Sequence, residues 1–565
     1  MRIKMPLGVE FFEEIMEDKS YYVDKTGFIK ELLSESFKVN LITRPRRFGK
    51  TLAMTMLDTF FNIRKNSTAF FAGLEIAQEL DLCSKWMNQW PVLFLTLKDV
   101  EGNTFEDAYE ILKNVIASLC IDHRYLSDSE AVDVQDKAAF LRLKAGKGSE
   151  TDIKSSLFLL TRIMADYYGK QVILLIDEYD VPLAKANDNG YYQEMLNIIR
   201  SLLGRTWKTN AALKFAVVTG CLRIAKESIF TGANNFVAHS IAEKQYSHYF
   251  GFTQQEVCKL LEDMQFSEYL PQVKKWYDGY VFGGTEIYCP WDVVNYVSTL
   301  KVDPQALPGS YWKSTSHNNI IRKFIDIKDI AVNDKFEILI SGGVIQEKIV
   351  EDLTYDLDSS SEANLWSILY LTGYLTQTPS DKIPNTVKPE PEKMMLCIPN
   401  EEVKTIFVET VAKWFTDTVA VQDRSAFFAA WWNGKDKELT KQVTDILFDT
   451  ISYFDYKEDY YHAFVAGLFA GAGYAVSSNS EQGTGRADIL VKDRRNRRAI
   501  IIEVKRSKTE KRMPKDCEAA LEQIDREKYT IHLLKGYKTI LCYGAAFFEK
   551  SCMIKYSKNK ERNSS

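Results

Sequence analysis

Two carboxylates and a lysine near the carboxyl end of the chain have the types and spacing of a metal-dependent hydrolytic site. Asp488 begins one apolar segment in GRADILV, and Glu503 and Lys505 lie in the next, IIIEVK. Side chains at positions i and i+2 of a strand share a face, so we expect Glu503 and Lys505 to lie together. Carboxylate and backbone oxygens suit Mg²⁺, and a neighbouring lysine can position and deprotonate a water molecule. The pattern predicts phosphodiester hydrolysis, with Asp488, Glu503 and Lys505 as catalytic residues and the two acids as metal ligands.

Polar residues around this motif extend the predicted site. Gln523 lies on a predicted helix over about residues 517–528 and is assigned a catalytic role, holding the attacking water or a phosphate. Glu481 is a further candidate carboxylate, and Arg486 is a candidate contact to the phosphate backbone. Tyr461 and His462, on an earlier helix, either face the site or are packed helix residues.

The local charge fits a phosphate-binding role. Residues 486–515 contain twelve basic and four acidic residues, in a chain whose net charge is −5. Such a segment favours a surface that faces phosphate. The run DRRNRR within it is also typical of a solvated hairpin turn, so both interpretations stay open.

A second group of residues, near the amino terminus, has the pattern of a phosphate-binding loop. The stretch ITRPRRFGKT (42–51) lies between a predicted strand at 39–43 and a helical run, TLAMTMLDTFF. In such a loop backbone amides wrap a phosphate, the lysine reaches the β- and γ-phosphates, and the threonine hydroxyl binds Mg²⁺. The predicted nucleotide-binding residues of the loop are Arg46, Arg47, Phe48, Gly49, Lys50 and Thr51.

Arg44 occupies the position where the usual loop pattern has its first glycine. We expect Arg44, Arg46 and Arg47 to form a basic collar that meets either phosphate or another part of the protein. Lys50 is expected to face solvent, so that Lys50→Ala would weaken nucleotide binding without unfolding the chain.

Two later strands end in side chains that suit the same nucleotide site. In QVILLIDEYD five apolar residues precede Asp177 and Glu178. An aspartate at the end of a buried strand can hold Mg²⁺, as Thr51 does, and the next carboxylate can polarise the attacking water. Thr219, at the end of KFAVVTG, either senses the γ-phosphate or is a capping hydroxyl. Arg223 either contacts phosphate, within one subunit or across a boundary between subunits of a homo-oligomer, or lies on the surface.

A chain of 565 residues is too long for a single hydrophobic core, so we expect it to fold as several domains. Apolar runs alternate with amphipathic stretches in the first part of the chain, which predicts an α/β fold with a parallel sheet and helices on both faces. The strands predicted there are 39–43, 92–97, 172–176 and 215–219. The predicted domains are 1–235 (nucleotide-binding), 236–330 (a small helical or winged-helix lid), 331–445 (a mostly helical connecting region), 446–550 (a compact α/β nuclease-like unit) and 551–565 (a flexible tail). The strands predicted in the nuclease-like unit are 487–491, 499–505 and 539–543.

Cysteine usage and the lengths of the apolar runs indicate the cellular compartment of the protein. The nine cysteines form no C-x-x-C pair, which favours a reducing cytoplasm over a disulfide framework or a zinc site. The start MRIKMPLGVEFFEE lacks the apolar core of a signal peptide. No apolar run reaches the roughly 18 residues of a membrane span. We therefore expect a cytoplasmic protein without a membrane partner.

The amino-terminal motifs resemble those of the AAA-ATPase-like family of bacteria and archaea. RPRRFGKT, LLIDEYD and VVTGCLRIAKESIFTGANN carry the resemblance, together with YYVDKTGFIKELL, WYDGY and YCPWDVVNY, over about residues 5–300. The arginine-containing loop recurs in that family, so Arg44 matches the family's form. The resemblance implies a P-loop NTPase fold that takes ATP and Mg²⁺ as cofactors.

The carboxyl-terminal motifs resemble the PD-(D/E)XK nuclease superfamily. SNSEQGTGRADILV and IIIEVKRS carry this resemblance over about residues 446–545, with Ala487 where the name-giving pattern has proline. The resemblance implies a restriction-endonuclease-like domain that acts on nucleic acid, which we expect to be DNA.

Three functions are compatible with these patterns. The first is an ATP-binding and ATP-hydrolysing protein fused to a Mg²⁺-dependent nuclease, whose nucleotide state gates cleavage. The second is a nucleotide-switched nucleic-acid-binding or signalling protein with an inactive nuclease fold, which the intact Asp488, Glu503 and Lys505 set disfavours. The third, a helicase or translocase, lacks an additional motor motif and ranks last.

Overall fold

The chain forms two compact units. The computed structural model describes residues 4–224, 229, 236–312, 335–336, 338–351, 353, 362–383, 388–408, 425–450, 461, 464–466, 468–469, 474–482, 485–493, 495–527, 529–533 and 536–558. The amino-terminal unit comprises Met1–Ser316 and Gln346–Val403, and the carboxyl-terminal unit comprises His317–Ile345 and Lys404–Ser565. Residues 346–403, which the sequence places in a connecting region, therefore belong to the amino-terminal unit.

A five-stranded parallel sheet forms the centre of the amino-terminal unit, with strand order β2-β3-β4-β1-β5. The strands are β1 (Val39–Thr43), β2 (Val92–Thr96), β3 (Val172–Asp177), β4 (Leu213–Gly220) and β5 (Phe236–His239). The first four confirm the strands predicted from apolar runs. β5 lies beyond the predicted boundary at residue 235. Its apolar run, Phe-Val-Ala, is only three residues long and half-buried, so it is a weaker signal than the runs of the other strands.

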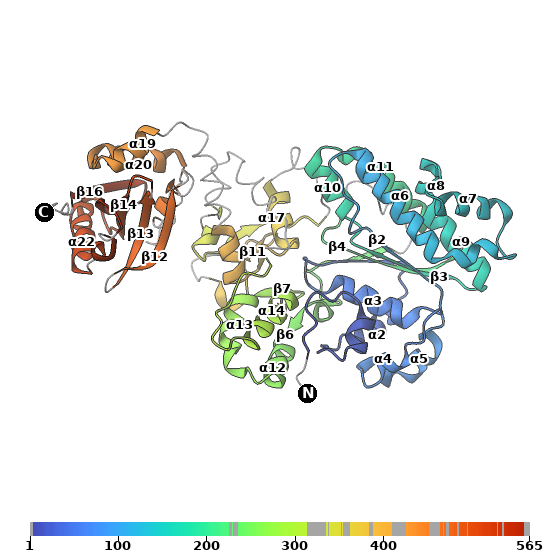
Figure 1. Cartoon of the computed structure of the whole chain (residues 1–565). Coiled ribbons are helices and arrows are strands. Elements are labelled where there is room, and N and C mark those ends of the chain that lie inside the picture. Colours follow the sequence, from blue (N-terminus) through green and yellow to red (C-terminus); the bar gives the residue numbers. More distant parts are fainter. Residues whose placement is uncertain are drawn as a thin grey trace. The chain divides into compact units, whose positions relative to one another are not determined.

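Helices cover both faces of this sheet, as predicted (Figure 1). On one face lie α2 (Gly27–Ser34) and α3 (Lys50–Phe61), and on the other lie α6 (Phe105–Asp122), α9 (Ser156–Tyr168) and α11 (Tyr192–Trp207). Further helices of this part are α1 (Phe12–Glu17), α4 (Thr68–Phe71), α5 (Leu80–Trp86), α7 (Val134–Lys144), α8 (Glu150–Lys154) and α10 (Val181–Asn189). Because the sheet is covered on both sides, every residue of β3 is buried.

A small helical unit with a β-hairpin follows the central sheet. It contains α12 (Gln254–Asp263), α13 (Leu270–Tyr277) and α14 (Pro290–Leu300), together with the antiparallel strands β6 (Phe252–Thr253), β7 (Tyr280–Phe282) and β8 (Thr285–Tyr288). Gly283 and Gly284, both with positive φ, make the two-residue turn between β7 and β8. Glycine suits such a turn because both positions require left-handed backbone.

The chain from residue 345 to 402 adds a second small sheet that the sequence did not predict. It contains β9 (Ile345–Glu347), α17 (Glu362–Leu371), β10 (Thr376–Gln377) and β11 (Met394–Cys397), with strand order β10-β11-β9. The expectation of a mostly helical connection misses these strands. They are two to four residues long, too short for a period of two to stand out.

The carboxyl-terminal unit is built on a mixed sheet with strand order β12-β13-β14-β15-β16. β14 and β15 are parallel, and the other pairs are antiparallel. The strands are β12 (Ala475–Gln482), β13 (Gly485–Asp493), β14 (Arg498–Arg506), β15 (Thr539–Phe548) and β16 (Ser551–Lys558). Its helices in the described part of the chain include α19 (Ser425–Trp432), α20 (Asp436–Thr450), α22 (Met513–Arg526) and α23 (Thr530–Leu533).

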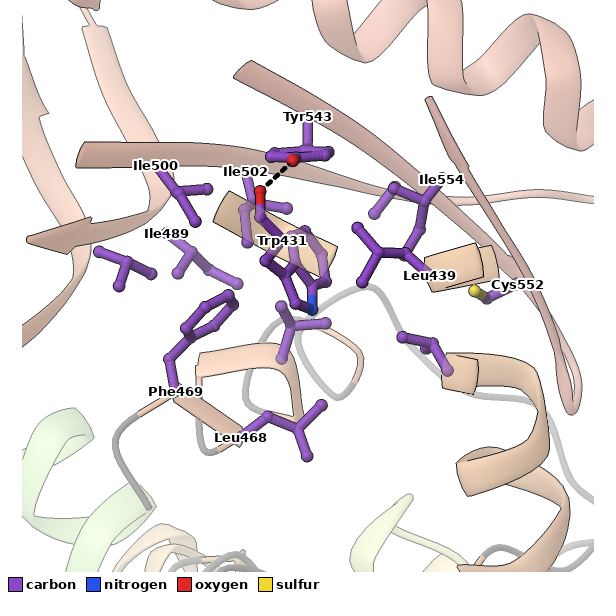
Figure 2. Packing of buried hydrophobic residues seen from close by; sticks show 14 of the residues in the cluster. Trp431, Leu439, Leu468, Phe469, Ile489, Ile500, Ile502, Tyr543, Cys552 and Ile554 are labelled. Carbon is purple, nitrogen blue, oxygen red and sulfur yellow. Dashed lines mark hydrogen bonds between the residues drawn. The ribbon is translucent and has the colours of Figure 1, made fainter. Parts of the chain in front are cut away.

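Alternation along β14 sends its side chains into two different environments. Ile500, Ile502 and Val504 belong to a cluster that contains Trp431 and Phe469, as Figure 2 shows for the labelled residues. Ala499 and Ile501 pack on the opposite face with α22. The alternation expected from the sequence is therefore present, and it places Glu503 on the α22 face.

Part of the predicted tail is ordered sheet. Residues 551–558 form β16, which pairs along its length with β15. The prediction of a flexible tail from residue 551 is therefore wrong for these residues. Tail residues 559–565 lie outside the described part of the chain.

We expect Trp431→Ala to destabilise the carboxyl-terminal unit strongly. The Trp431 ring is fully buried, with its centroid 4.8 Å from that of Tyr543 and 5.2 Å from that of Phe469. Removing such a ring costs about 3–5 kcal/mol in free energy of unfolding. Hydrogen exchange of the β14 amides measures the loss of stability. The control is Trp276→Ala, which alters a half-buried tryptophan on α13 of the other unit. Equal β14 exchange rates in the two variants would contradict this role.

Candidate active sites

The loop between β1 and α3 has the backbone of a phosphate-binding loop. Gly49, the residue before α3, has a φ of 81°, a left-handed conformation that glycine adopts without strain. α3 is 12 residues long, and the backbone amides of its first turn point toward the loop as helix-start donors do. Gly49 is exposed. The loop can therefore present amides to an anion.

Lys50 is buried, so the expectation that it faces solvent is wrong. Its side chain is 2% exposed, and its ammonium donates to the carbonyl oxygens of Arg44 and Pro45, both at 3.2 Å. The Glu178 carboxylate lies 3.3 Å away. Burial by itself lowers the pKa of Lys50, but Cys221 and the nearby carboxylates more than offset it and raise the pKa above its usual value. The lysine therefore stays charged inside the loop.

The side chains of Asp177, Thr51 and Thr219 meet where β3 and β4 end and α3 begins. Thr51, in the first turn of α3, donates a 2.7 Å hydrogen bond to Asp177 at the end of β3. Thr219, near the end of β4, donates to the other carboxylate oxygen. Burial, followed by the charge of Glu178, raises the pKa of Asp177. The hydroxyl and carboxylate predicted to hold Mg²⁺ are thus adjacent, and they fit that ion.

Glu178 has an unusual backbone conformation. Its φ is 54°, in the left-handed region that non-glycine residues rarely adopt. Such strain costs on the order of 1–3 kcal/mol and tends to occur at functional sites. The conformation turns the Glu178 carboxylate toward Lys50 and leaves it partly exposed, which suits a residue that positions water.

Tyr179 and Asp180 are site residues that the sequence analysis missed. One Asp180 oxygen accepts hydrogen bonds from the amides of Cys221 and Leu222, both at 3.0 Å. The Tyr179 hydroxyl donates to the Leu222 carbonyl at 2.7 Å. A Cβ at Gly220 would lie 2.6 Å from Asp180 and 2.7 Å from Tyr179. These contacts lock the chain after Thr219 onto the turn that carries Glu178. The signal was the YD that follows the acid pair.

The arginine collar is divided between different roles, and Arg44 does not face the nucleotide site. Its guanidinium is fully buried and donates to the carbonyls of Thr43 and His239, both at 2.8 Å. It also lies 5.2 Å from the ring centroid of Phe250. Burial lowers the pKa of Arg44 to about 10. Arg44 therefore meets another part of the protein, which is one of the two alternatives left open by the sequence.

The next loop residues also contact the segment after the central sheet. The Phe48 ring is buried, 4.9 Å from Tyr280 and 5.1 Å from Phe282. The Arg47 guanidinium lies 4.2 Å from the ring centroid of Trp291. The Arg46 carbonyl accepts a hydrogen bond from the indole N–H of Trp312. The side chains of Arg47 and Phe48 are thus turned to other elements, and nucleotide contacts of Arg46, Arg47 and Phe48 stay predictions.

Arg223 is placed beside β5. Its guanidinium lies 5.8 Å from the ring centroid of Phe236, and its backbone carbonyl accepts from the Leu353 amide. Its predicted contact with phosphate stays a prediction.

In the carboxyl-terminal unit, Asp488, Glu503 and Lys505 come together. The register that pairs Ile489 with Ile502 sets Asp488 opposite Glu503 on the neighbouring strand. Asp488 accepts a 2.9 Å hydrogen bond from the Val504 amide, and the Lys505 ammonium lies 3.1 Å from a Glu503 oxygen. The geometry thus unites the three residues that the spacing of the motif predicted.

One oxygen of Glu503 is buried without a hydrogen-bond partner among the described residues. The residue is fully buried, and burial, followed by the charge of Asp488, raises its pKa to about 7 in spite of Lys505. Among those residues no three His, Cys, Asp or Glu side chains converge on a point. A divalent cation would satisfy the Glu503 oxygen, so Asp488, Glu503 and a backbone carbonyl fit Mg²⁺.

Tyr529 joins Gln523 to this group and was not predicted from the sequence. It is buried just after α22 and shares a side-chain hydrogen bond with Gln523. Burial raises the pKa of Tyr529, and the charges of Glu503 and Asp488 raise it further, so the phenol lies within their field. The structure therefore brings Gln523 to the edge of the site, with Tyr529 beside it.

Other candidate residues differ in outcome. Tyr461 stacks on Phe547 at 4.4 Å and donates to the Glu549 carbonyl. It belongs to the cluster of Ile502 and Val504, on the face opposite Glu503, so of the two alternatives Tyr461 is the packed residue and does not face the site. Glu481 and Arg486 pair in register on β12 and β13, but their side chains, and all of His462, lie outside the described structure.

Two family models match this chain, one in each unit. Residues 6–230 match the family model described as "Predicted AAA-ATPase", and residues 456–557 match the model of the PD-(D/E)XK nuclease superfamily. The chain is therefore similar to the AAA-ATPase-like family in its amino-terminal part and to the PD-(D/E)XK nuclease superfamily in its carboxyl-terminal part. Both resemblances seen in the sequence are thus confirmed.

One curated relative is similar along most of the chain. An uncharacterized protein in the vnfD 5′ region of Azotobacter chroococcum mcd 1 is 25% identical over 508 residues, which is 87% of each chain. The similarity therefore extends between the AAA-ATPase-like and nuclease domains. Across the described residues, no helix has the length and apolar character needed to cross a membrane.

We expect Lys50→Ala to abolish nucleotide binding and also to destabilise the ATPase-like domain, most strongly at high pH. Losing one partner of a buried ion pair costs about 3–5 kcal/mol. Burial already raises the pKa of Asp177, and that of Asp180 to about 6. Because folded-state pKa values above the unfolded ones favour folding only at low pH, the deficit should grow from about pH 6 to 8. Denaturation of Lys50→Ala and the surface control Lys259→Ala tests this; a pH-independent deficit would contradict it.

We expect the nuclease domain to bind Mg²⁺ more tightly as pH rises through 7. The raised pKa of Glu503 means that the cation competes with a proton below about pH 7. Without metal, the same shift means that the stability contributed by the protonated group is lost as pH rises from 4.5 to about 7. Calorimetry should show proton release on Mg²⁺ binding, and Glu503→Gln should lose it while gaining stability at about pH 8. Binding that is flat across this range would contradict the assignment.

Proposed function

We propose that this protein binds and hydrolyses ATP in its amino-terminal unit and cleaves phosphodiester bonds of nucleic acid in its carboxyl-terminal unit. The buried, unpartnered oxygen of Glu503, beside Asp488 and Lys505, carries the nuclease half. An inactive fold would have no reason to keep a carboxylate in so costly an environment. We further propose DNA as the substrate and Mg²⁺ as the metal.

In the nuclease site the protein residues position and activate water. Bound Mg²⁺ would stabilise charge on the scissile phosphate. Asp488 and Glu503 hold that ion, and Asp488 is itself oriented by the Val504 amide. The Lys505 ammonium, 3.1 Å from Glu503, lies where it can orient the attacking water. Gln523 steadies that water or a phosphate oxygen, with Tyr529 fixing its side chain.

In the ATPase site the groups have separate tasks. Loop amides and Lys50 bind the β- and γ-phosphates, which replace the loop carbonyls as partners of the ammonium. Thr51 and Asp177 hold the Mg²⁺ that accompanies ATP. Glu178 polarises the attacking water, and Thr219 holds Asp177 in place. The two-point attachment of Asp180 to the chain after Thr219 keeps these strand ends in register.

We also propose that nucleotide state controls cleavage, through Trp312. Its indole donates to the carbonyl of Arg46 in the phosphate-binding loop, and its backbone amide donates to the Glu402 carboxylate at 2.7 Å. Glu402 lies two residues before Lys404, where the longer segment of the carboxyl-terminal unit, Lys404–Ser565, begins. A change at the loop therefore has a hydrogen-bonded route to the start of the nuclease-bearing segment.

One cleavage assay tests these proposals together. Single- and double-stranded DNA and RNA are incubated with Mg²⁺ and with ATP, ADP or no nucleotide. We expect DNA cleavage that depends on nucleotide, is lost in Glu503→Gln by at least about 100-fold, and loses its nucleotide dependence in Lys50→Met. Glu522→Gln, an exposed acid on α22, is the matched control and should cleave normally.

Two outcomes would overturn parts of the proposal. Equal cleavage with ATP, ADP and no nucleotide would end the proposal that nucleotide gates the nuclease. Unchanged cleavage by Glu503→Gln, or no cleavage of any substrate by the unaltered chain, would favour a nucleotide-switched binding protein with an inactive nuclease fold.

A further inference from the structure

The basic residues of segment 486–515 divide into groups at opposite ends of β14. A hairpin group, Arg495, Arg497 and Arg498, lies at the start of the strand. A loop group begins at its last residue, Arg506, and continues beyond the strand with Lys508, Lys511, Arg512 and Lys515. At about 3.3 Å per residue, the nine-residue strand separates the two groups by roughly 25 Å. Glu503 and Lys505 lie at the end that carries the loop group.

The hairpin group is partly used to hold the fold. Arg498 pairs with Asp493 at 2.8 Å, and its guanidinium lies 4.2 Å from the centroid of the Trp432 ring. The Arg497 carbonyl accepts from the Lys538 amide. This group therefore closes the β13–β14 turn, which favours the hairpin interpretation for the run DRRNRR.

Hydrogen bonds, an ion pair and apolar packing hold the backbone of the loop group in place. Ser507 is buried, its amide donates to the Phe547 carbonyl at 2.8 Å, and its hydroxyl donates to Asp516 at 2.7 Å. Arg512 also pairs with Asp516, and Met513 packs into a small apolar cluster. Both ends of the loop are thus anchored, which holds its basic side chains close to the end of β14.

The lysines of this loop are exposed and have no ion pair within the described structure. Lys508, Lys511 and Lys515 lie on the surface, and only Glu510 and Asp516 are acidic between residues 506 and 516. Leaving such like charges together costs free energy through mutual repulsion, which a polyanion would relieve. Their position one short loop beyond Glu503 sets that polyanion beside the catalytic carboxylates.

We propose that residues 506–515, here called the basic loop, are the docking surface that holds the phosphate backbone of the nucleic-acid substrate next to the scissile bond. The inference rests on the proposed nuclease function. The hairpin group at the far end of β14 is not part of this surface. Contacts between lysines and phosphates add affinity without reading base sequence, so docking is expected to be sequence-independent and strongly weakened by salt.

Two variants of equal charge, both in the Glu503→Gln background, test the proposal. One carries Lys508→Gln, Lys511→Gln and Lys515→Gln, and the control carries Lys492→Gln, Arg495→Gln and Arg497→Gln at the other end of the strand. Fluorescence anisotropy measures binding of labelled single- and double-stranded 20-nucleotide DNA of two unrelated sequences over a series of salt concentrations. Circular dichroism establishes that both variants fold.

We expect the basic-loop variant to bind at least about tenfold more weakly at low salt, and the control to change less than twofold. The slope of log affinity against log salt should fall by about 2–3 for duplex, since each lost phosphate contact removes about 0.9. Equal losses in the two variants would show only a general charge effect and overturn the proposal, as would no loss in either.

The docking proposal and the nuclease proposal fail in different ways. If the basic-loop variant binds DNA normally while Glu503→Gln abolishes cleavage, the docking surface is wrong and the nuclease function stands. If the unaltered chain never cleaves but the basic-loop variant alone loses DNA binding, the docking surface stands on an inactive nuclease fold.

Discussion

The buried ammonium of Lys50 is the constraint around which the amino-terminal unit is arranged. A lysine that is 2% exposed must be neutralised, and Glu178, Asp177 and Asp180 supply the opposing charge. Each acid is then fixed in turn: Thr51 and Thr219 bind Asp177, and two backbone amides bind Asp180. The ends of β1, β3 and β4 are therefore joined through one compact electrostatic network. The left-handed conformation of Glu178 is the local strain that completes it.

A second buried cation explains the unusual form of the loop. Arg44 stands where the common pattern has glycine, and its guanidinium binds the carbonyl at the end of β5 beside Phe250. The loop is thereby a structural centre as well as a proposed phosphate site, because Phe48 and Arg47 also contact residues after the central sheet. Gly373 approaches so closely that a Cβ there would lie 2.9 Å from Pro45. The loop is therefore packed against several later segments of the amino-terminal unit.

The nuclease site depends on a different balance, between the apolar packing of β14 and the charge it carries. Ile502 and Val504 pack on Trp431's side of the sheet, and this alternation forces Glu503 to the α22 face, where it is fully buried. The apolar clusters on both faces hold the strand in register in spite of the cost of burying a carboxylate. The charge of Asp488 adds to that cost and raises the pKa of Glu503. The Lys505 ammonium offsets part of it and lowers the pKa.

The sequence by itself determined the elements whose signal is local. Apolar runs marked β1 to β4 and β14, and short motifs identified Lys50, Asp177, Asp488 and Glu503. The tertiary structure alone decided what depends on distant partners. β5 exists through pairing with β1, far along the chain, and β9 to β11 form a sheet from strands that are not consecutive in their order, whereas β16 completes a hairpin with β15. The tertiary structure likewise buries Lys50 and Arg44. It also places Tyr529 beside Gln523 and Tyr461 on the face opposite Glu503. The physical reason is that burial, charge compensation and strand pairing are properties of residues brought together by folding, which no window of sequence contains.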